Sequence, residues 1–150
     1  MPEKETLRRA RRDKRQGKSP STQAGEFVRE EIEHVREGKH GARSPEQAIA
    51  IGLSKARRAG VKLPAPKKGK ASKSTRKRAR KDLAAGRKPS RRASPGRARA
   101  VKKALRKEPH RTVSKRALSR HAKKAARRRP ATARKAAARK AARTRKRRGS

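Results

Sequence analysis

Histidines and carboxylates are the side chains of this chain that could act as general acids, general bases or metal ligands. The four histidines, His34, His40, His110 and His121, have spacings that match no usual metal-ligand motif. Glu30 with Glu31, or Glu26 with Glu30, could form a carboxylate pair, but acid–base catalysis needs a shielded pocket that shifts pKa values. We therefore expect surface histidines, no metal site, no cofactor and no enzymatic activity.

Lys and Arg are present in large excess. The 150 residues contain 53 Lys and Arg but only 11 Asp and Glu, a formal net charge of +42. Residues 67–150 hold 37 of those cations and two acids, Asp82 and Glu108. Cations spread along a chain can neutralise successive phosphates and release bound counterions. The composition predicts binding to a nucleic acid through its backbone.

The residues that we expect to bind phosphate lie in the C-terminal half of the chain. They are Arg76, Lys77, Arg78, Arg80, Lys102, Lys103, Arg106, Lys107, Lys115, Arg116, Arg120, Lys123, Lys124, Arg127, Arg128, Arg134, Lys135, Arg139, Lys140 and Arg143. No rigid element that could present side chains to base edges is apparent, which predicts weak sequence preference. Phe27 is the only aromatic residue, which disfavours single-strand binding by base stacking.

Residues 19–63 are the part that looks built to fold, as a helix–loop–helix hairpin. Ser21 or Thr22 can cap a first helix that runs to about Glu37. The second helix has Ser44 as its cap, Pro45 in its first turn and a capping box with Gln47. It should end near residue 60, where a glycine suits a left-handed cap.

The two faces of this hairpin predict different roles. The first helix places Glu26, Glu30, Glu33 and Glu37 on the side opposite its apolar residues, so we expect an outward acidic stripe. The apolar core is too small to be secure alone, and it should need a second copy, a partner or the basic helices. The expected protein-contact residues are Phe27, Val28, Ile32, Ile51 and Leu53.

The remaining segments read as solvated chain. Residues 1–18 should form a charged, fraying helix, 64–75 a linker, and 76–150 a tail. The tail is broken into short helical pieces at Gly86, Pro89, Pro95-Gly96, Pro109, Pro130 and Gly149. Crowded like charges should leave these pieces mostly unformed in free solution. The expected fold class is therefore mostly α and disordered, with no large core.

Targeting signals are not apparent. The N-terminal residues lack an apolar region, and the longest apolar stretch, residues 48–53, is too short to span a membrane. The chain has no Cys, which permits a reducing compartment. We expect a cytoplasmic protein at the nucleoid, with no membrane partner.

Two stretches resemble known families. Residues 21–28 (STQAGEFV) and 48–60 (AIAIGLSKARRAG) resemble a bacterial family of small basic proteins of unknown function. Residues 122–130 (AKKAARRRP) and 133–143 (ARKAAARKAAR) are similar to the tails of linker histones and bacterial histone H1-like proteins. The first resemblance implies bacterial origin and an association with DNA, but no known site. The winged-helix domain of eukaryotic linker histones has no counterpart here.

The leading expectation is a non-enzymatic, nucleoid-associated protein that neutralises and compacts duplex DNA with little sequence preference. An RNA- or ribosome-associated basic protein is an alternative within the same broad class. A third interpretation makes the hairpin an adaptor for a specific protein, tethered to polyanions by the tail, and the acidic stripe favours it because phosphate would repel glutamates. In the leading interpretation the tail supplies the affinity, and the hairpin supplies self-association or a contact with a protein partner.

Overall fold

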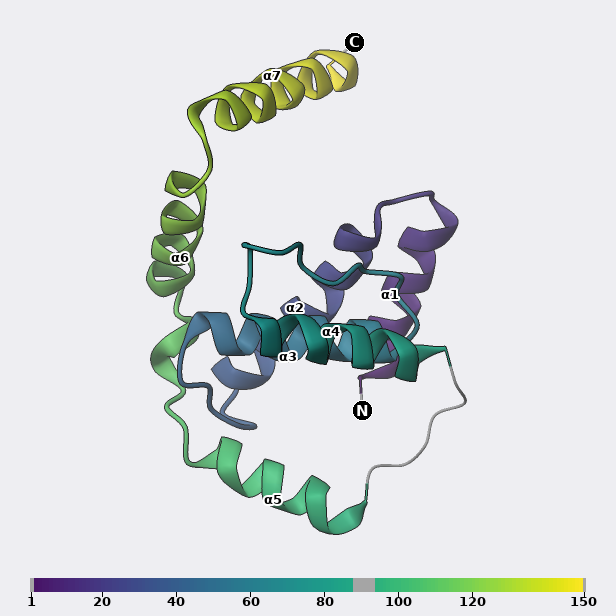
Figure 1. Ribbon diagram of the computed structural model, residues 1–150, viewed down its shortest axis with the longest axis vertical. Helices are drawn as coiled ribbons and strands as arrows, with labels where there is room; N and C mark the ends of the chain where they lie inside the picture. Colours follow the sequence, from purple (N-terminus) through teal and green to yellow (C-terminus); the bar gives the residue numbers. More distant parts are fainter. Residues whose placement is uncertain (1, 88–93, 150) are drawn as a thin grey trace. The chain divides into compact units, whose positions relative to one another are not determined.

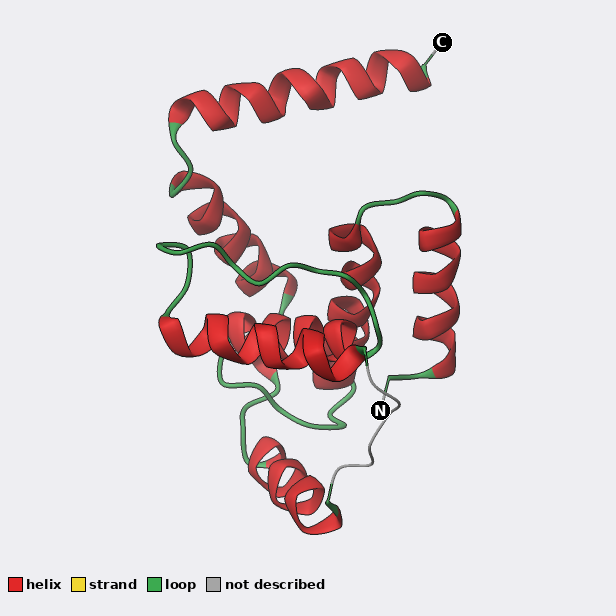
Figure 2. Ribbon diagram, turned by 45° about the vertical axis from the view of Figure 1, so that its right-hand side comes forward, coloured by secondary structure: helices red, strands yellow, loops and turns green. Residues whose placement is uncertain are grey.

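The computed structural model describes residues 2–87 and 94–149, which form α-helices, one short 3-10 helix and no strand (Figures 1 and 2). The helices are α1 (Lys4–Arg15), α2 (Pro20–Arg36), α3 (Pro45–Arg58), α4 (Lys73–Gly86), α5 (Pro95–Arg106), η1 (Arg111–Val113), α6 (Lys115–Arg127) and α7 (Ala131–Arg148). The chain divides into two compact units, Met1–Ser114 and Lys115–Ser150.

Serine–proline pairs start the two hairpin helices. The Ser19 hydroxyl accepts the backbone N–H of Thr22 at 3.3 Å, with Pro20 in the first turn. The helix therefore begins before the predicted caps Ser21 and Thr22, because proline suits the first helical position and serine the position before it. Ser44 caps α3 as predicted, accepting the Gln47 N–H at 3.3 Å.

Glycines in the left-handed region follow both helices. Gly38 has φ 73° and Gly60 has φ 91°, and these are the positions at which the sequence predicts the helix ends. Within α3, Gly52 lies against the backbone of Val28 on α2, so that an added Cβ would come within 2.6 Å of the Val28 Cα. This close approach sets how tightly α2 and α3 pack.

Two apolar clusters form the core of the first unit. The first joins α1, α2, α3 and the segment after α3; its buried members are Ala10, Ala24, Phe27, Ala56 and Val61, with Leu7, Leu53 and Leu63 packed against them. The second joins α2, α3 and η1 through Val35, Ala42, Ala48 and Val113, with Ile32 alongside. Both clusters contain residues from outside the predicted hairpin.

The predicted fold class, mostly disordered and without a large core, was wrong. The described chain is helical and its helices pack, with α1 against α2 and α4 against α3. The expectation of a fraying N-terminal helix fails because Leu7 and Ala10 enter the core. The expectation of unformed tail pieces fails as well, because Ala, Arg and Lys favour helix and Ser72 and Ser94 cap α4 and α5.

Backbone hydrogen bonds attach the segment after α5 to the hairpin loop. The N–H of Gly41 donates to the Leu105 carbonyl at 2.9 Å, and the N–H of Ala42 donates to the Pro109 carbonyl at 3.0 Å. The Thr112 hydroxyl donates to the Ala42 carbonyl at 2.7 Å.

The predicted segments are 1–18, 19–63, 64–75 and 76–150. Their boundaries state which parts of the chain fold independently, and they stay predictions. The break at Pro89 lies outside the described residues.

Candidate nucleic-acid interface

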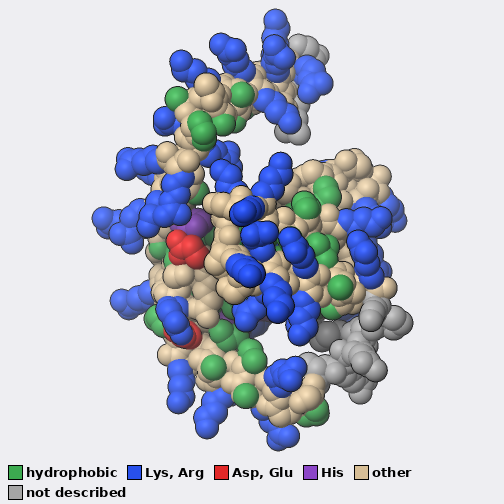
Figure 3. Space-filling model, in the orientation of Figure 1, with side chains coloured by type: hydrophobic (Ala, Val, Ile, Leu, Met, Phe, Trp, Pro, Cys, Tyr) green, Lys and Arg blue, Asp and Glu red, His purple; other side chains and the backbone are tan. Residues whose placement is uncertain are grey.

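The cations predicted to bind phosphate lie on or beside α4, α5, α6 and α7, and nearly all are exposed. The exception is Arg76, which is half-buried and whose Nε atom is buried without a hydrogen-bond partner. The helices α5 and α6 bury none of their residues. Figure 3 shows Lys and Arg side chains covering much of the visible surface.

The helix α7 has a high density of positive charge. This helix carries nine Lys and Arg and no acid in its 18 residues. At a rise of about 1.5 Å per residue it is roughly 27 Å long, which corresponds to one cation per about 3 Å. Duplex B-DNA carries about one phosphate charge per 1.7 Å of its axis, so the linear charge densities of the helix and the duplex are of the same order. The cations of α7 are therefore dense enough that several of them face any polyanion that lies against one side of the helix.

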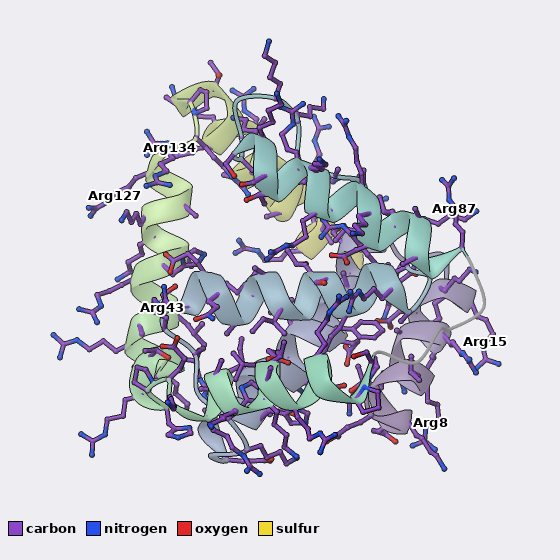
Figure 4. The ribbon with its side chains drawn as sticks, turned by 60° about the horizontal axis from the view of Figure 1, so that its bottom comes forward. Arg8, Arg15, Arg43, Arg87, Arg127 and Arg134 are labelled. Carbon is purple, nitrogen blue, oxygen red and sulfur yellow. The ribbon has the colours of Figure 1, made fainter. Side chains whose placement is uncertain are left out.

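The second unit contains many cations and no acidic side chain. Residues 115–150 carry seventeen Lys and Arg and no Asp or Glu. On α6, Ala117, Leu118 and His121 are half-buried, while its Lys and Arg are exposed. Figure 4 shows Arg127 and Arg134 projecting away from the helices that carry them. These side chains are therefore accessible to a polyanion.

The two acids of the C-terminal half bind residues of the hairpin instead. Asp82 is buried and accepts hydrogen bonds from Ser54 at 2.8 Å and from Arg58 at 3.0 Å. Glu108 pairs with Arg43 at 3.1 Å. Both carboxylates are therefore engaged within the first unit, Asp82 in a buried contact between α3 and α4 and Glu108 in a pair at the surface.

A basic face on α1 was missed at the sequence level. An open depression on this helix is lined by Leu7 and by five cations, Lys4, Arg8, Arg11, Lys14 and Arg15. Figure 4 shows Arg8 and Arg15 projecting outward from α1. The signal was the helical spacing of residues 4, 8, 11 and 15, which places them on one side. The first unit thus has a basic face on α1 besides the predicted cations of α4 and α5.

The predicted acidic stripe does not face outward as a whole. Glu30 is only 2% exposed, and Glu26 pairs with Arg9 of α1 at 2.7 Å. The expectation was wrong because α1 and α3 cover this side of α2 and supply cations, among them Lys55 at 3.2 Å from Glu30. Glu33 stays at the surface, paired with Arg29 at 2.9 Å.

Hydrogen bonds keep the buried Glu30 carboxyl ionised. Burial by itself would raise its pKa, but interactions with the Thr6 side chain, the Glu3 N–H and Lys55 outweigh burial and hold the pKa below the ordinary value. The Glu3 N–H donates to Glu30 at 3.1 Å. A hydrogen bond with His34 and the nearby Lys39 ammonium also lower the pKa of Glu3. The N-terminal segment is thereby attached to α2.

The predicted protein-contact residues take part in packing within the chain. Phe27 is 1% exposed, while Leu53 and Ile32 pack against the first and second cluster. Val28 lies against Gly52, and Ile51 is half-buried. A role for these five residues in binding another chain stays a prediction.

Glu31, His34 and His40 are brought together by the fold. Their possible ligand atoms all lie within 4.8 Å of one another. Sequence spacing led us to expect isolated surface histidines, whereas His34 and His40 are half-buried. The signal was the Glu-x-x-His spacing of residues 31 and 34, which puts both side chains on one face of a helix.

These features define an all-helical protein with a packed first unit and an exposed, strongly basic surface. Residues 11–69 match the family model of DUF6496, described as a family of unknown function. The match contains residues 21–28 and 48–60, the stretches that we expected to resemble a family of unknown function. The resemblance to a family of unknown function is therefore confirmed. No curated protein and no solved structure matches the chain. None of the described helices is long and apolar enough to cross a membrane.

Proposed function

We propose that this protein binds duplex DNA without strong sequence preference and compacts it as a nucleoid-associated protein of the bacterial cytoplasm. The observation that carries the proposal is the cation spacing of α7, nine Lys and Arg on 18 residues without an acid. The likeness of residues 122–143 to histone H1-like tails agrees with it. No catalytic step is part of this function.

Groove dimensions favour duplex DNA over duplex RNA. An α-helix with its side chains is about 10–12 Å across, and the major groove of B-DNA is about 12 Å wide. The major groove of A-form RNA is deep and narrow, and side chains do not reach into it. A helix surrounded by cations can lie in the DNA groove and contact both flanking backbones.

The alternatives have less support. An RNA- or ribosome-associated role needs the same polycation, but the chain has a single aromatic residue, Phe27, and that residue is buried. The adaptor interpretation was favoured by an outward acidic stripe, and Glu30 of that stripe is internal. Partner binding through another face of the first unit is left as an outcome of the tests.

The decisive experiment measures DNA affinity as a function of salt for the full chain and for a chain without residues 131–150. With about ten phosphates engaged, the log–log slope should be near −9, a loss of about five decades between 50 and 200 mM salt. The truncated chain should bind every duplex more weakly and with a shallower slope. A full-chain slope shallower than about −3, or strong preference between two duplexes of equal length, contradicts the proposal.

A matched pair of variants tests charge against other properties of α7. Replacing Arg134, Lys135, Arg139 and Lys140 with Gln should reduce the slope by about 3.6, or 0.9 for each lost phosphate contact. Replacing only Lys135 and Lys140 with Arg keeps the charge and should leave the slope unchanged. Competition with duplex RNA, and recovery from cells treated with a DNA- or an RNA-specific nuclease, separate the DNA from the RNA interpretation.

A further inference from the structure

A buried carboxylate and two half-buried imidazoles meet where α2 ends and the following loop folds back on it. Glu31 and His34 lie one turn apart on α2, and His40 comes from the loop between α2 and α3. The two imidazole rings are 6.1 Å apart, centre to centre, and nearly perpendicular at 86°. This cluster has no part in the phosphate-binding surface proposed above.

Glu31 is buried without regular hydrogen bonds. Its side chain is 1% exposed, and neither carboxylate oxygen has a hydrogen-bond partner of good geometry. Lys55 Nζ lies at ion-pair distance from one oxygen, 2.6 Å from Oε2. A buried acceptor without directed donors is costly. The Oε1 atom therefore has the capacity to bind a cation.

The orientation of His40 presents a lone pair to that oxygen. Its Nδ1 lies 3.0 Å from the Gly41 carbonyl, which can only accept, so Nδ1–H is the donor. In a neutral ring Nε2 then carries a lone pair, and it faces Glu31 Oε1 at 3.1 Å. Two acceptors at this distance repel each other unless a proton or a metal ion lies between them.

His34 also has a carboxylate on one ring nitrogen. Its Nε2 lies 2.8 Å from Glu3 Oε1. Metal-binding histidines usually have one ring nitrogen held by a carboxylate or a backbone carbonyl, which orients the ring for the metal. Glu3 supplies such a group to His34, and the Gly41 carbonyl supplies it to His40.

We propose that Glu31, His34 and His40 bind one divalent transition-metal ion. Two imidazoles and one carboxylate suit Zn²⁺ and the ions near it in ligand preference, and they do not suit Mg²⁺, which prefers an all-oxygen set. The groups around the site are Glu3, Glu30, Lys39, Lys55 and His110. With the metal at Oε1, Lys55 remains the partner of Oε2.

The expected effect of the ion is to fasten the loop between α2 and α3 to the end of α2. That loop also carries the backbone hydrogen bonds to Leu105 and Pro109. Metal binding therefore stabilises the first unit by mass action, since a ligand that binds only the folded state increases the folded fraction. The inference does not depend on DNA binding.

The test uses the full chain, freed of nucleic acid by nuclease and high salt and then treated with a chelator. Titration calorimetry with Zn²⁺ at about pH 7 should show one equivalent. His40→Ala and His34→Ala should each weaken binding by about a hundredfold or more, since even second-layer partners of a metal contribute about ten- to a hundredfold. A saturating excess of about 100 Kd should raise the folded-to-unfolded ratio about a hundredfold in the wild type and have no such effect in either variant.

Controls distinguish this site from non-specific binding. His121→Ala, in the second unit, should leave Zn²⁺ affinity unchanged, and Mg²⁺ should not compete. Co²⁺ provides a spectroscopic readout, because a low-symmetry nitrogen and oxygen site gives stronger visible absorption than the hydrated ion. Zn²⁺ binding that survives in both His34→Ala and His40→Ala, or no binding by a folded wild type, overturns the proposal and leaves a protonated histidine beside Glu31 as the explanation.

Discussion

The hydroxyl of Ser54 on α3 donates a 2.8 Å hydrogen bond to the Asp82 carboxylate on α4. Asp82 is 5% exposed, and Arg58 approaches its other oxygen at 3.0 Å. One buried acid thus attaches the first helix of the basic C-terminal half to the hairpin. The sequence separates these partners by a stretch that reads as a linker.

Asp82→Ala should lower the free energy of unfolding by about 1–3 kcal/mol, because it removes the buried acceptor to which both Ser54 and Arg58 donate. Hydrogen exchange should accelerate across α4 more than across α2. The control is Glu33→Ala, which breaks an exposed pair with Arg29 and should change stability by about 0.5 kcal/mol or less. Equal effects from both variants would show that α4 is not held through Asp82.

Gly52→Ala should destabilise the first unit by about 1–3 kcal/mol, the usual cost of overpacking, because the new Cβ would lie 2.6 Å from the Val28 Cα. Gly25→Ala on α2 is the matched control, since its added Cβ meets nothing within 4 Å. That variant should stabilise by about 0.5–1 kcal/mol through helix propensity. Urea denaturation measures both, and the same sign for the two variants would contradict the close contact of α2 and α3.

Acid should destabilise the first unit through Glu30. The pKa of Glu30 is lowered in the folded state, so its contribution is complete above the unfolded value and is lost as the pH falls through the folded value. Glu30→Gln should therefore lower stability near neutral pH and reduce the further loss between about pH 5 and pH 3. Glu5→Gln on the exposed side of α1 is the control. If Glu30→Gln lost as much stability as the wild type when the pH falls over this range, Glu30 would not be the source of the acid sensitivity.

Leu53→Asp tests the proposed division of labour between the units. A charge placed against Phe27 and its neighbours should unfold much of the first unit, as seen by loss of helical circular dichroism. DNA affinity of the full chain should stay within about tenfold, or 1.4 kcal/mol, because α6 and α7 lie in the second unit and the cations of α4 and α5 keep their charge when the first unit unfolds. Leu53→Met conserves volume and should leave both properties unchanged. Loss of DNA binding as complete as that caused by deleting residues 131–150 would place the DNA-binding site in the first unit.

Local signals at the sequence level were enough to locate most helix boundaries. Ser44 and Pro45 start α3, Gly38 and Gly60 follow the hairpin helices, and Pro95 and Pro130 mark the starts of α5 and α7. These signals depend on neighbours within a few residues, because caps, proline and left-handed glycine act on the adjacent turn alone. The charge of the tail is likewise a property of composition.

Tertiary structure decided which polar groups are buried and which distant segments meet. No local pattern shows that Glu30 is buried between α1 and α3. The contacts of Asp82 with Ser54 and of His40 with Glu31 are likewise invisible in the local sequence. Such contacts join residues far apart in the chain, and they persist because each buried charge finds a partner that offsets its lost hydration. The sequence by itself determined most helix boundaries and how much charge the helices carry, while packing determined which charged side chains are buried and which remain exposed.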